Sequence, residues 1–313
     1  MKSLICFLAA GVLLVSPSVL EAKIVRTVEK TFAVQPGTSL KASTQGGDII
    51  IQTADIAEVR ITARQKIRAS SESEADDLLK ELALTMEQRG DEIVVESKYE
   101  KGGLGFFRSF WPPVSVSYTV TVPTKFNLHL ATSGGDIKVA NLSGQVRART
   151  SGGDMQFARI DGDLDARTSG GNISLQEGTA EAKLHTSGGD IVVERAGGPT
   201  KVSTSGGNIT LNSVAQLIRA TTSGGDIKAM LTSAFSEDSL LSTSGGNVRV
   251  QVPKTASFKL DAHTSGGKVD AAGLTLTLES SSTSKSRLVG TVNGGGPVLK
   301  LRTSGGDIRV RTE

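Results

Sequence analysis

Apolar and polar residues alternate through most of the chain, and in its central part the alternation repeats every 18 residues. Each repeat contains two short stretches in which every second residue is apolar, the two-residue period of a β-strand. One apolar column of the first stretch holds Ile137, Met155, Ile173, Ile191, Ile209 and Ile227. The matching column of the second stretch holds Val146, Leu164, Ala182, Thr200 and Ile218. We therefore predict two strands with an inward face in every repeat.

A Thr-Ser-Gly-Gly tetrapeptide, followed by Asp, Asn or Lys, separates these stretches. Its first glycine falls at residues 134, 152, 170, 188, 206 and 224, and then at 245, 266 and 305. A fixed period of this length is typical of a solenoid, in which each repeat forms one coil stacked on the previous coil. The sequence thus predicts an all-β fold, a single-stranded parallel β-solenoid with two-strand coils of 18–21 residues. A final strand over 308–311 is expected to form a blunt C-terminal cap.

We interpret the repeated motif as a structural corner. The strand alternation turns its threonine inward, where the hydroxyl can bond backbone groups of the corner. The glycines are expected to bend the chain with positive φ angles, and Asp or Asn to accept corner N–H groups. The predicted corner residues of the central repeats are Thr150, Gly152, Gly153, Asp154, Gly170, Gly171, Asn172, Gly188, Gly189 and Asp190.

The N-terminal third departs from the 18-residue period. The segment Gly46-Gly47-Asp48 looks like a first, isolated coil. Ser71 and Glu74 form a capping box before apolar residues at helical spacing, which predicts one short helix over 71–83. The segment Arg89-Gly90-Asp91-Glu92 has the composition of a hairpin turn. These elements predict an α+β cap at the N-terminal end of the stack.

Residues 1–22 have the pattern of a secretory signal peptide, since their apolar run is too short to cross a bilayer and ends in small residues. Its cleavage would remove Cys6, the only cysteine, and with it any thiol or disulfide chemistry. We expect a mature chain without a transmembrane segment, exported to the periplasm, cell surface or exterior of a bacterium. Residues 23–131 would form the cap with the first coil, and residues 132–313 the repeats.

Charge is nearly balanced, with 35 basic and 32 acidic residues, so no global field favours nucleic acid or an anionic membrane. Basic residues nevertheless gather in the outward columns of the second strands: Arg147, Arg149, Arg167, Lys183, Lys201 and Arg219. They are either a solvated face that discourages sheet pairing or a surface for an anionic ligand such as an envelope glycan.

A segment bounded by glycines and prolines carries four of the twelve aromatic residues of the chain. These are Phe106, Phe107, Phe110 and Trp111. The rings either cover the apolar end of the stack or offer an apolar patch to a partner, a glycan or a membrane surface. Both interpretations stay open.

Residue sets for catalysis or metal binding are scarce. One cysteine and three histidines supply neither a zinc set nor a nucleophilic triad. Asp136 and Asp154 on adjacent coils could lie about 5 Å apart, as in a retaining glycosidase, although any aspartate ladder has that spacing. A calcium-bound β-roll would need Gly-Gly-x-Gly-x-Asp at both corners. We expect no enzyme, no cofactor and no metal, with a polysaccharide-active enzyme and a calcium-stabilised roll as the alternatives.

The chain as a whole resembles a known bacterial family. The segments Gly46-Gly47-Asp48-Ile49 and Tyr118-Thr119-Val120-Thr121-Val122-Pro123, with the repeated Thr-Ser-Gly-Gly-Asp-Ile, are similar to those of adhesin-like proteins with β-strand repeats, whose function is unknown. The resemblance covers residues 24–313 and implies surface recognition or a scaffold role, toward a cell-surface glycan or an envelope protein. Repeated side chains would supply many weak contacts along the stack. The oligomeric state stays open.

Overall fold

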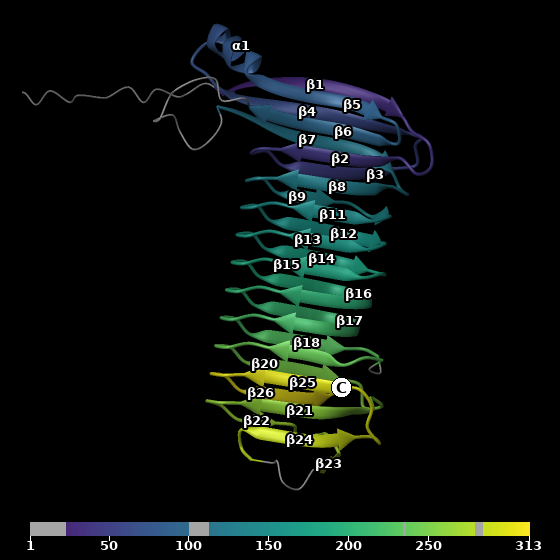
Figure 1. Ribbon diagram of the computed structural model, residues 1–313, viewed down its shortest axis with the longest axis vertical. Coiled ribbons are helices and arrows are strands. Elements are labelled where there is room, and N and C mark those ends of the chain that lie inside the picture. Colours follow the sequence, from purple (N-terminus) through teal and green to yellow (C-terminus); the bar gives the residue numbers. More distant parts are fainter. Residues whose placement is uncertain (1–22, 100–112, 234–235, 279–283) are drawn as a thin grey trace, which may run out of the picture.

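The computed structural model describes residues 23–99, 113–233, 236–278 and 284–313. These residues form 26 strands and one helix, which confirms the expected all-β class with a single helix. The strands are stacked along one long axis (Figure 1). The predicted signal peptide lies outside the described residues, as do the four clustered aromatic residues Phe106, Phe107, Phe110 and Trp111.

The coils contribute strands to two layers. The first-strand layer follows the Ser-Gly-Gly corners and contains β3 (Ile49–Ala54), β9 (Ile137–Val139), β12 (Met155–Asp161), β14 (Ile173–Gly178), β18 (Ile227–Leu231), β20 (Val248–Val252), β22 (Val269–Asp270) and β26 (Ile308–Thr312). The second-strand layer precedes those corners and contains β2 (Ser39–Thr44), β8 (Asn127–Thr132), β11 (Val146–Arg149), β13 (Leu164–Arg167), β15 (Ala182–His185), β19 (Ser239–Ser242), β21 (Phe258–Thr264) and β25 (Val298–Thr303). Three further strands connect the layers: β10 (Leu142–Ser143), β16 (Ile191–Ser203) and β17 (Ile209–Thr221).

Neighbouring central coils pair in parallel, because the 18-residue repeat places equivalent residues beside one another. Met155 pairs with Ile137 on one side and with Ile173 on the other. In the second-strand layer, Val146 pairs with Leu164. These inward residues have at most 3% of their surface exposed, and together they form a thin aliphatic core between the layers. All six residues of the expected first-strand column are buried: Ile137, Met155, Ile173, Ile191, Ile209 and Ile227.

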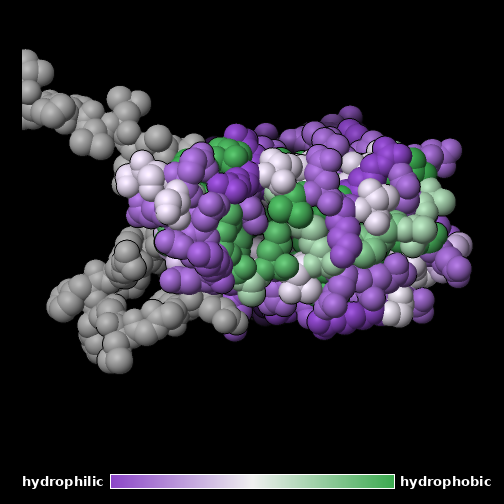
Figure 2. Space-filling model, turned by 90° about the horizontal axis from the view of Figure 1, so that it is seen from above, coloured by the Kyte–Doolittle hydropathy of each residue, from purple (hydrophilic) through white to green (hydrophobic). Residues whose placement is uncertain are grey.

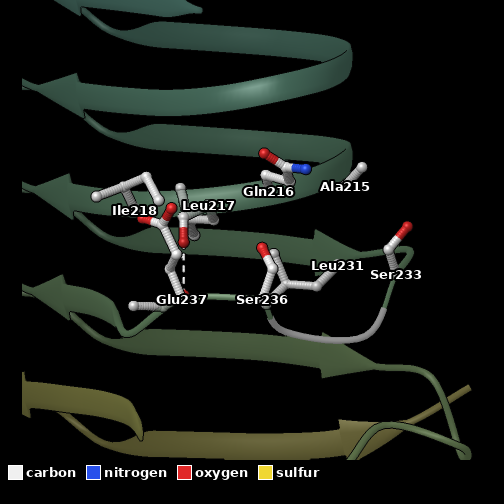
Figure 3. Close-up of a pocket in the computed structure, with 9 residues that line it drawn as sticks. Ala215, Gln216, Leu217, Ile218, Leu231, Ser233, Ser236 and Glu237 are labelled. Carbon is white, nitrogen blue, oxygen red and sulfur yellow. Dashed lines mark hydrogen bonds between the residues drawn. The ribbon is translucent and has the colours of Figure 1, made fainter. Parts of the chain in front are cut away.

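The second-strand column loses its phase at Ile218, where the expected inward position is wrong. Thr200 pairs with Leu217, and the next residue, Lys201, pairs with Arg219. Leu217 is therefore the buried residue, whereas Ile218 is partly exposed. The extra residue forms a β-bulge, in which two residues of one strand face one residue of its partner. Figure 3 shows this part of the chain.

Antiparallel strands close the N-terminal end of the stack. They are β1 (Lys23–Ala33), β4 (Glu58–Arg68), β5 (Leu82–Arg89), β6 (Glu92–Tyr99) and β7 (Val114–Pro123). Strand β4 pairs with β1 and β7, and β5 pairs with β6. Strands β2 and β3 pair in parallel with β6 and β7 on one side and with β8 and β9 on the other. The coil of Thr44 is thus an integral layer of the stack and not an isolated coil.

The helix α1 (Glu72–Lys80) begins at the predicted capping box. Ser71 is its N-cap, and the Ser71 Oγ accepts the N–H of Glu74 at 3.2 Å. The helix is shorter than the expected 71–83, because Leu82 already begins β5 and pairs with β6. Backbone pairing in the hairpin therefore overrides the helical spacing of the last leucines.

The helix lies at the N-terminal end of the stack (Figure 1). Ala75 is its fully buried residue, while Leu78 and Leu79 pack against the core and stay partly exposed. Figure 2 looks onto this end and shows apolar side chains in the middle, with polar side chains around them. The described residues therefore cover this end of the core only in part.

The last coil of the chain is not the last coil of the stack. Strand β25 pairs in parallel with β19 and β21, and β26 pairs with β20 and β22. The coil of Thr303 therefore lies between those of Thr243 and Thr264, and the expected blunt cap at 308–311 is wrong. The outer end is formed by β23 (Leu276–Leu278) and β24 (Arg287–Val292), which pair antiparallel with each other and extend from β21.

Candidate functional site

The repeated threonine of each corner is buried and fully hydrogen bonded. Thr150 Oγ1 donates to the carbonyl of Gly135 on the preceding coil at 3.0 Å and accepts the N–H of Gly153 at 3.4 Å. Thr168 makes the equivalent bonds at 3.1 and 3.3 Å. Exposure of the corner threonines does not exceed 7%. The hydroxyls thus satisfy backbone groups that the stacking would otherwise leave buried without a partner.

The glycines of the Ser-Gly-Gly corners are required by close stacking and do not have the expected positive φ, whereas Gly144 at the opposite corner does, with a φ of 150°. A Cβ added to Gly153 would lie 2.0 Å from the carbonyl oxygen of Gly135. At Gly171 the equivalent distance, to the carbonyl of Gly153, is 1.9 Å. The first glycine of the pair has more room, since a Cβ on Gly152 would find its nearest atom at 3.8 Å. The second glycine is therefore the residue that lets adjacent coils touch.

A ladder of Asp and Asn side chains runs along the same corners. In stack order it contains Asp48, Asp136, Asp154, Asn172, Asp190, Asn208, Asp226, Asn247, Asp307 and Lys268. Each Oδ1 accepts the backbone N–H of the next member at 2.6–3.0 Å. Because the last coil is inserted, Asp and Asn alternate without interruption from Asp154 to Asp307. The alternation limits repulsion between carboxylates at strand spacing.

Amide groups of the ladder also bond the carboxylates beside them. The Asn247 Nδ2 donates to Asp226 Oδ1 at 3.1 Å, and Arg249 forms an ion pair with Asp226 at 2.9 Å. Partial burial would raise the pKa of Asp226, but the bonds from Asn247 and Arg249 outweigh it and hold that pKa below its usual range. The ladder carboxylates are thus acceptors within the corner, including the Oδ1 atoms of Asp136 and Asp154.

The six basic residues singled out from the sequence lie together on the outward side of the second-strand layer. We call this surface the basic face; it comprises Arg147, Arg149, Arg167, Lys183, Lys201 and Arg219, all of them exposed. One column reads His129, Arg147, Asp165, Lys183, Lys201, Arg219, and the parallel column reads Ala131, Arg149, Arg167, His185, Ser203, Thr221. The strand pairing therefore aligns side chains from six consecutive coils, and the basic residues come from five of them.

Carboxylates neutralise only part of the basic face. Arg167 pairs with Asp165 at 2.8 Å, while Glu181 pairs with both Lys183 and Lys201, at 2.7 and 3.1 Å. Hydrogen bonds from Lys183 and Lys201 hold the pKa of Glu181 below its usual range.

The remaining three cations of the basic face are Arg147, Arg149 and Arg219. Among the residues that the structure describes, none of them has an ion pair or a side-chain hydrogen bond. Two carboxylates thus form ion pairs with three of the six cations, and the other three cations are available to an external anion.

A shallow depression lies on this face. Its lining consists of Asp165, Arg167, Lys183, Leu184, His185, Lys201, Val202, Ser203 and Arg219. His185 Nδ1 lies 2.8 Å from Ser203 Oγ, so the two form a hydrogen bond beside the cations. Sequence reasoning missed His185, Ser203 and Thr221, although their phase within the repeat is the phase of Arg149 and Arg167. Listing the outward columns in full would have identified them.

A narrower depression sits at the bulge in β17, next to the longer connection before β19 (Figure 3). It is lined by Leu217, Leu231 and Glu237, among others, and the Ser239 Oγ donates to the carbonyl of Leu217. Across the described part of the chain, no three or more His, Cys, Asp or Glu side chains are placed to hold a metal ion. No helix among the described residues has the length and apolar character needed to cross a membrane.

These features define a class of protein: an elongated all-β stack whose repeated residues build the stack and whose outward residues remain exposed. Residues 38–311 match the family model described as Toastrack DUF4097, and the chain belongs to this family. No curated protein matches the chain significantly.

Several solved bacterial structures align with most of the chain. A "putative adhesin" from Bacteroides fragilis is 12% identical with a TM-score of 0.45, and the alignment covers 91% of this chain and 97% of that one. A "putative adhesin" from Parabacteroides distasonis is 13% identical with a TM-score of 0.48 and the same coverage, 91% and 97%. A "putative lipid binding protein" from the same species is 13% identical with a TM-score of 0.44, covering 91% of this chain and 96% of that one.

Proposed function

We propose that the protein is an exported, non-enzymatic binding or scaffold protein of the bacterial cell envelope, built as a single-stranded parallel β-solenoid. The parallel pairing of equivalent residues from Ile137 to Ile227 supports the solenoid. Residues 1–22 would be its signal peptide and residues 23–131 its cap. An adhesin-like role agrees with the names of two solved bacterial structures to which the chain is similar, both called "putative adhesin".

The basic face is the proposed ligand surface, and its ligand is anionic. One observation carries this proposal: Arg147, Arg149 and Arg219 are exposed and have no ion pair among the described residues. The other three cations of the face share two carboxylates, so positive charge is in excess there. A face that served solubility alone would need no such excess, since mixed charges keep a surface soluble. Cations aligned on consecutive coils add their contacts along one ligand.

The two alternatives have less support. Catalysis by stacked carboxylates requires an aspartate that is free to act, but Asp136 and Asp154 each accept a backbone N–H through Oδ1. A calcium roll requires several oxygen ligands around one point, whereas these carboxylates form a single file along the corner. Binding is therefore favoured over cleavage and over a metal-stabilised structure.

The test is retention of the purified protein on an immobilised acidic glycan, with release of reducing ends from the same glycan measured in parallel. We expect retention without release. A variant with Arg147, Lys183, Lys201 and Arg219 all replaced by Ser should lose retention while keeping its melting temperature. Release of reducing ends would identify an enzyme, and equal retention of the variant would overturn the assignment of the surface.

The stack offers a matched control for this variant on the first-strand layer. Lys138 and Lys228 are exposed without an ion pair among the described residues, as are Arg147 and Arg219. Arg159 and Arg195 share one carboxylate, that of Glu177, as Lys183 and Lys201 share Glu181. Replacing these four control residues by Ser removes the same charge from the opposite surface. The control variant should be retained like the native protein.

A further inference from the structure

We infer that the basic face binds one linear acidic polysaccharide that lies along the long axis of the stack, with successive acidic sugars on successive coils. This inference rests on the proposed function and adds the class of ligand and its direction. It follows from the spacing of the cations, the side chains beside them and the shape of the surface.

The spacing follows from the parallel register. Lys183, Lys201 and Arg219 occupy the same column on three consecutive coils, and adjacent strands lie about 4.8 Å apart. A linear polymer of uronic acids carries one carboxylate per sugar, and one sugar with its linkage has roughly the length of that strand spacing. A straight chain along the axis therefore keeps step with the coils, so that the carboxylates that face the stack lie beside cations of this column.

The neighbouring column supplies the chemistry that a sugar needs besides its charge. His185, Ser203 and Thr221 follow one another on the coils of Lys183, Lys201 and Arg219. A hydroxyl or imidazole thus stands next to each of these three cations, within reach of the hydroxyl groups of the same sugar. The pair of a cation and a neutral hydrogen-bonding side chain is repeated from coil to coil, as the sugar itself is repeated.

Other polyanions fit this surface less well. Single-stranded nucleic acid is held largely by bases stacked on aromatic side chains, and neither outward column of these coils contains Phe, Tyr or Trp. Duplex DNA carries one charge per about 1.7 Å of its axis, a much denser array than the cations. Firm attachment to a lipid surface needs apolar groups that enter it, whereas the two outward columns of the basic face hold polar or charged side chains on these coils.

One position of the cation column carries a negative charge. Asp165 stands between Arg147 and Lys183 in the cation column and is bonded to Arg167. If the polymer runs along this column, the Asp165→Lys substitution completes five cations in a row and should tighten binding. Glu177→Lys makes the same change of two charge units on the first-strand layer and, like Asp165→Lys, removes an ion-paired carboxylate, so it is the matched control. From the strength of exposed ion pairs, we expect about a twofold to fivefold gain for Asp165→Lys.

The experiment measures Kd by calorimetry for uronic acid oligomers of one to eight sugars, with the native protein, Asp165→Lys and Glu177→Lys. We expect affinity to rise with length until an oligomer spans the five coils and then to level off, and Asp165→Lys to bind the long oligomers more tightly than the control. Equal Kd values for short and long oligomers, or equal values for the two variants, would overturn the axial arrangement.

Three further ligands separate this inference from the proposed function. Single-stranded DNA, duplex DNA and anionic phospholipid vesicles are titrated under the same salt conditions. Tighter binding to any of them than to the longest oligomer would contradict the assignment of a polysaccharide ligand, while the basic face would still be an anion-binding surface. Absence of binding to every anion tested would overturn the proposed function itself. Circular dichroism of both variants shows that any loss is not a loss of fold.

Discussion

Adjacent glycines of one corner should differ sharply in their tolerance of a methyl group. The Cβ of Gly153→Ala would lie 2.0 Å from the carbonyl oxygen of Gly135, where ordinary contacts begin near 3.4 Å. The two coils would have to separate by the difference, about 1.4 Å. That separation exceeds the reach of the hydrogen bonds that Thr150 and Asp154 make to the preceding coil, at 3.0 and 2.9 Å.

The expected loss follows from these contacts. Breaking two or three interstrand hydrogen bonds at about 1 kcal/mol each, together with strain in a packed interior, gives a destabilisation of roughly 3 kcal/mol for Gly153→Ala. For Gly152→Ala the nearest atom is 3.8 Å from the added Cβ, so its effect should stay within about 0.5 kcal/mol.

Urea unfolding followed by far-ultraviolet circular dichroism measures both variants, with the slope of the transition used to check that the unfolded states are comparable. If Gly153→Ala unfolds at the same urea concentration as Gly152→Ala, close stacking is not the reason for the second glycine. Equal and large losses in both variants would instead indicate that both positions need the backbone freedom of glycine.

Two further predictions concern the corner hydroxyls and the outer end of the stack. Thr168→Val keeps the shape but leaves the Gly153 carbonyl and the Gly171 N–H without their partner, so urea unfolding should show a loss of about 2–4 kcal/mol; an unchanged midpoint would contradict the assigned role. Hydrogen bonds from Arg311 and from the backbone of Ala272 lower the pKa of Asp270 to about 2. Because the folded pKa lies below the usual value of 3.8, this carboxylate stabilises the fold above that value and its contribution fades as pH falls toward 2. The Asp270→Asn variant should show a smaller drop in melting temperature between pH 4.5 and 2.5 than the native protein, and parallel curves would contradict the assignment.

The periodic part of the fold could be predicted from sequence because burial there depends only on position within the repeat. Ile137 and Ile191 share a phase, and both are fully buried. The outward cations followed from the same phase. The prediction failed at Ile218, where the 18-residue alternation is interrupted by a β-bulge. A bulge depends on how one strand pairs with its neighbour, and the aligned repeat sequences do not show that pairing.

Two other failures have physical causes of a different kind. The glycines of the Ser-Gly-Gly corners were expected to have positive φ, but the contact that requires Gly153 comes from Gly135 on the preceding coil, which composition alone does not locate. Strands β25 and β26 insert between earlier coils, so the order of the last coils in the stack differs from their order in the sequence. Sequence order predicts stacking order only while successive repeats stay adjacent, and the step of 39 positions from Gly266 to Gly305 allows the chain to return.

The most direct test of the basic face is the salt dependence of binding to an acidic glycan. Exposed charge contacts weaken as ions screen them, and the slope of log Kd against log salt grows with the number of contacts formed. We expect a steep slope for the native protein, and the same slope when Lys138, Arg159, Arg195 and Lys228 are replaced by Ser. Replacing Arg147, Lys183, Lys201 and Arg219 by Ser should leave a much shallower slope. Identical slopes for the two quadruple variants would contradict binding at the basic face.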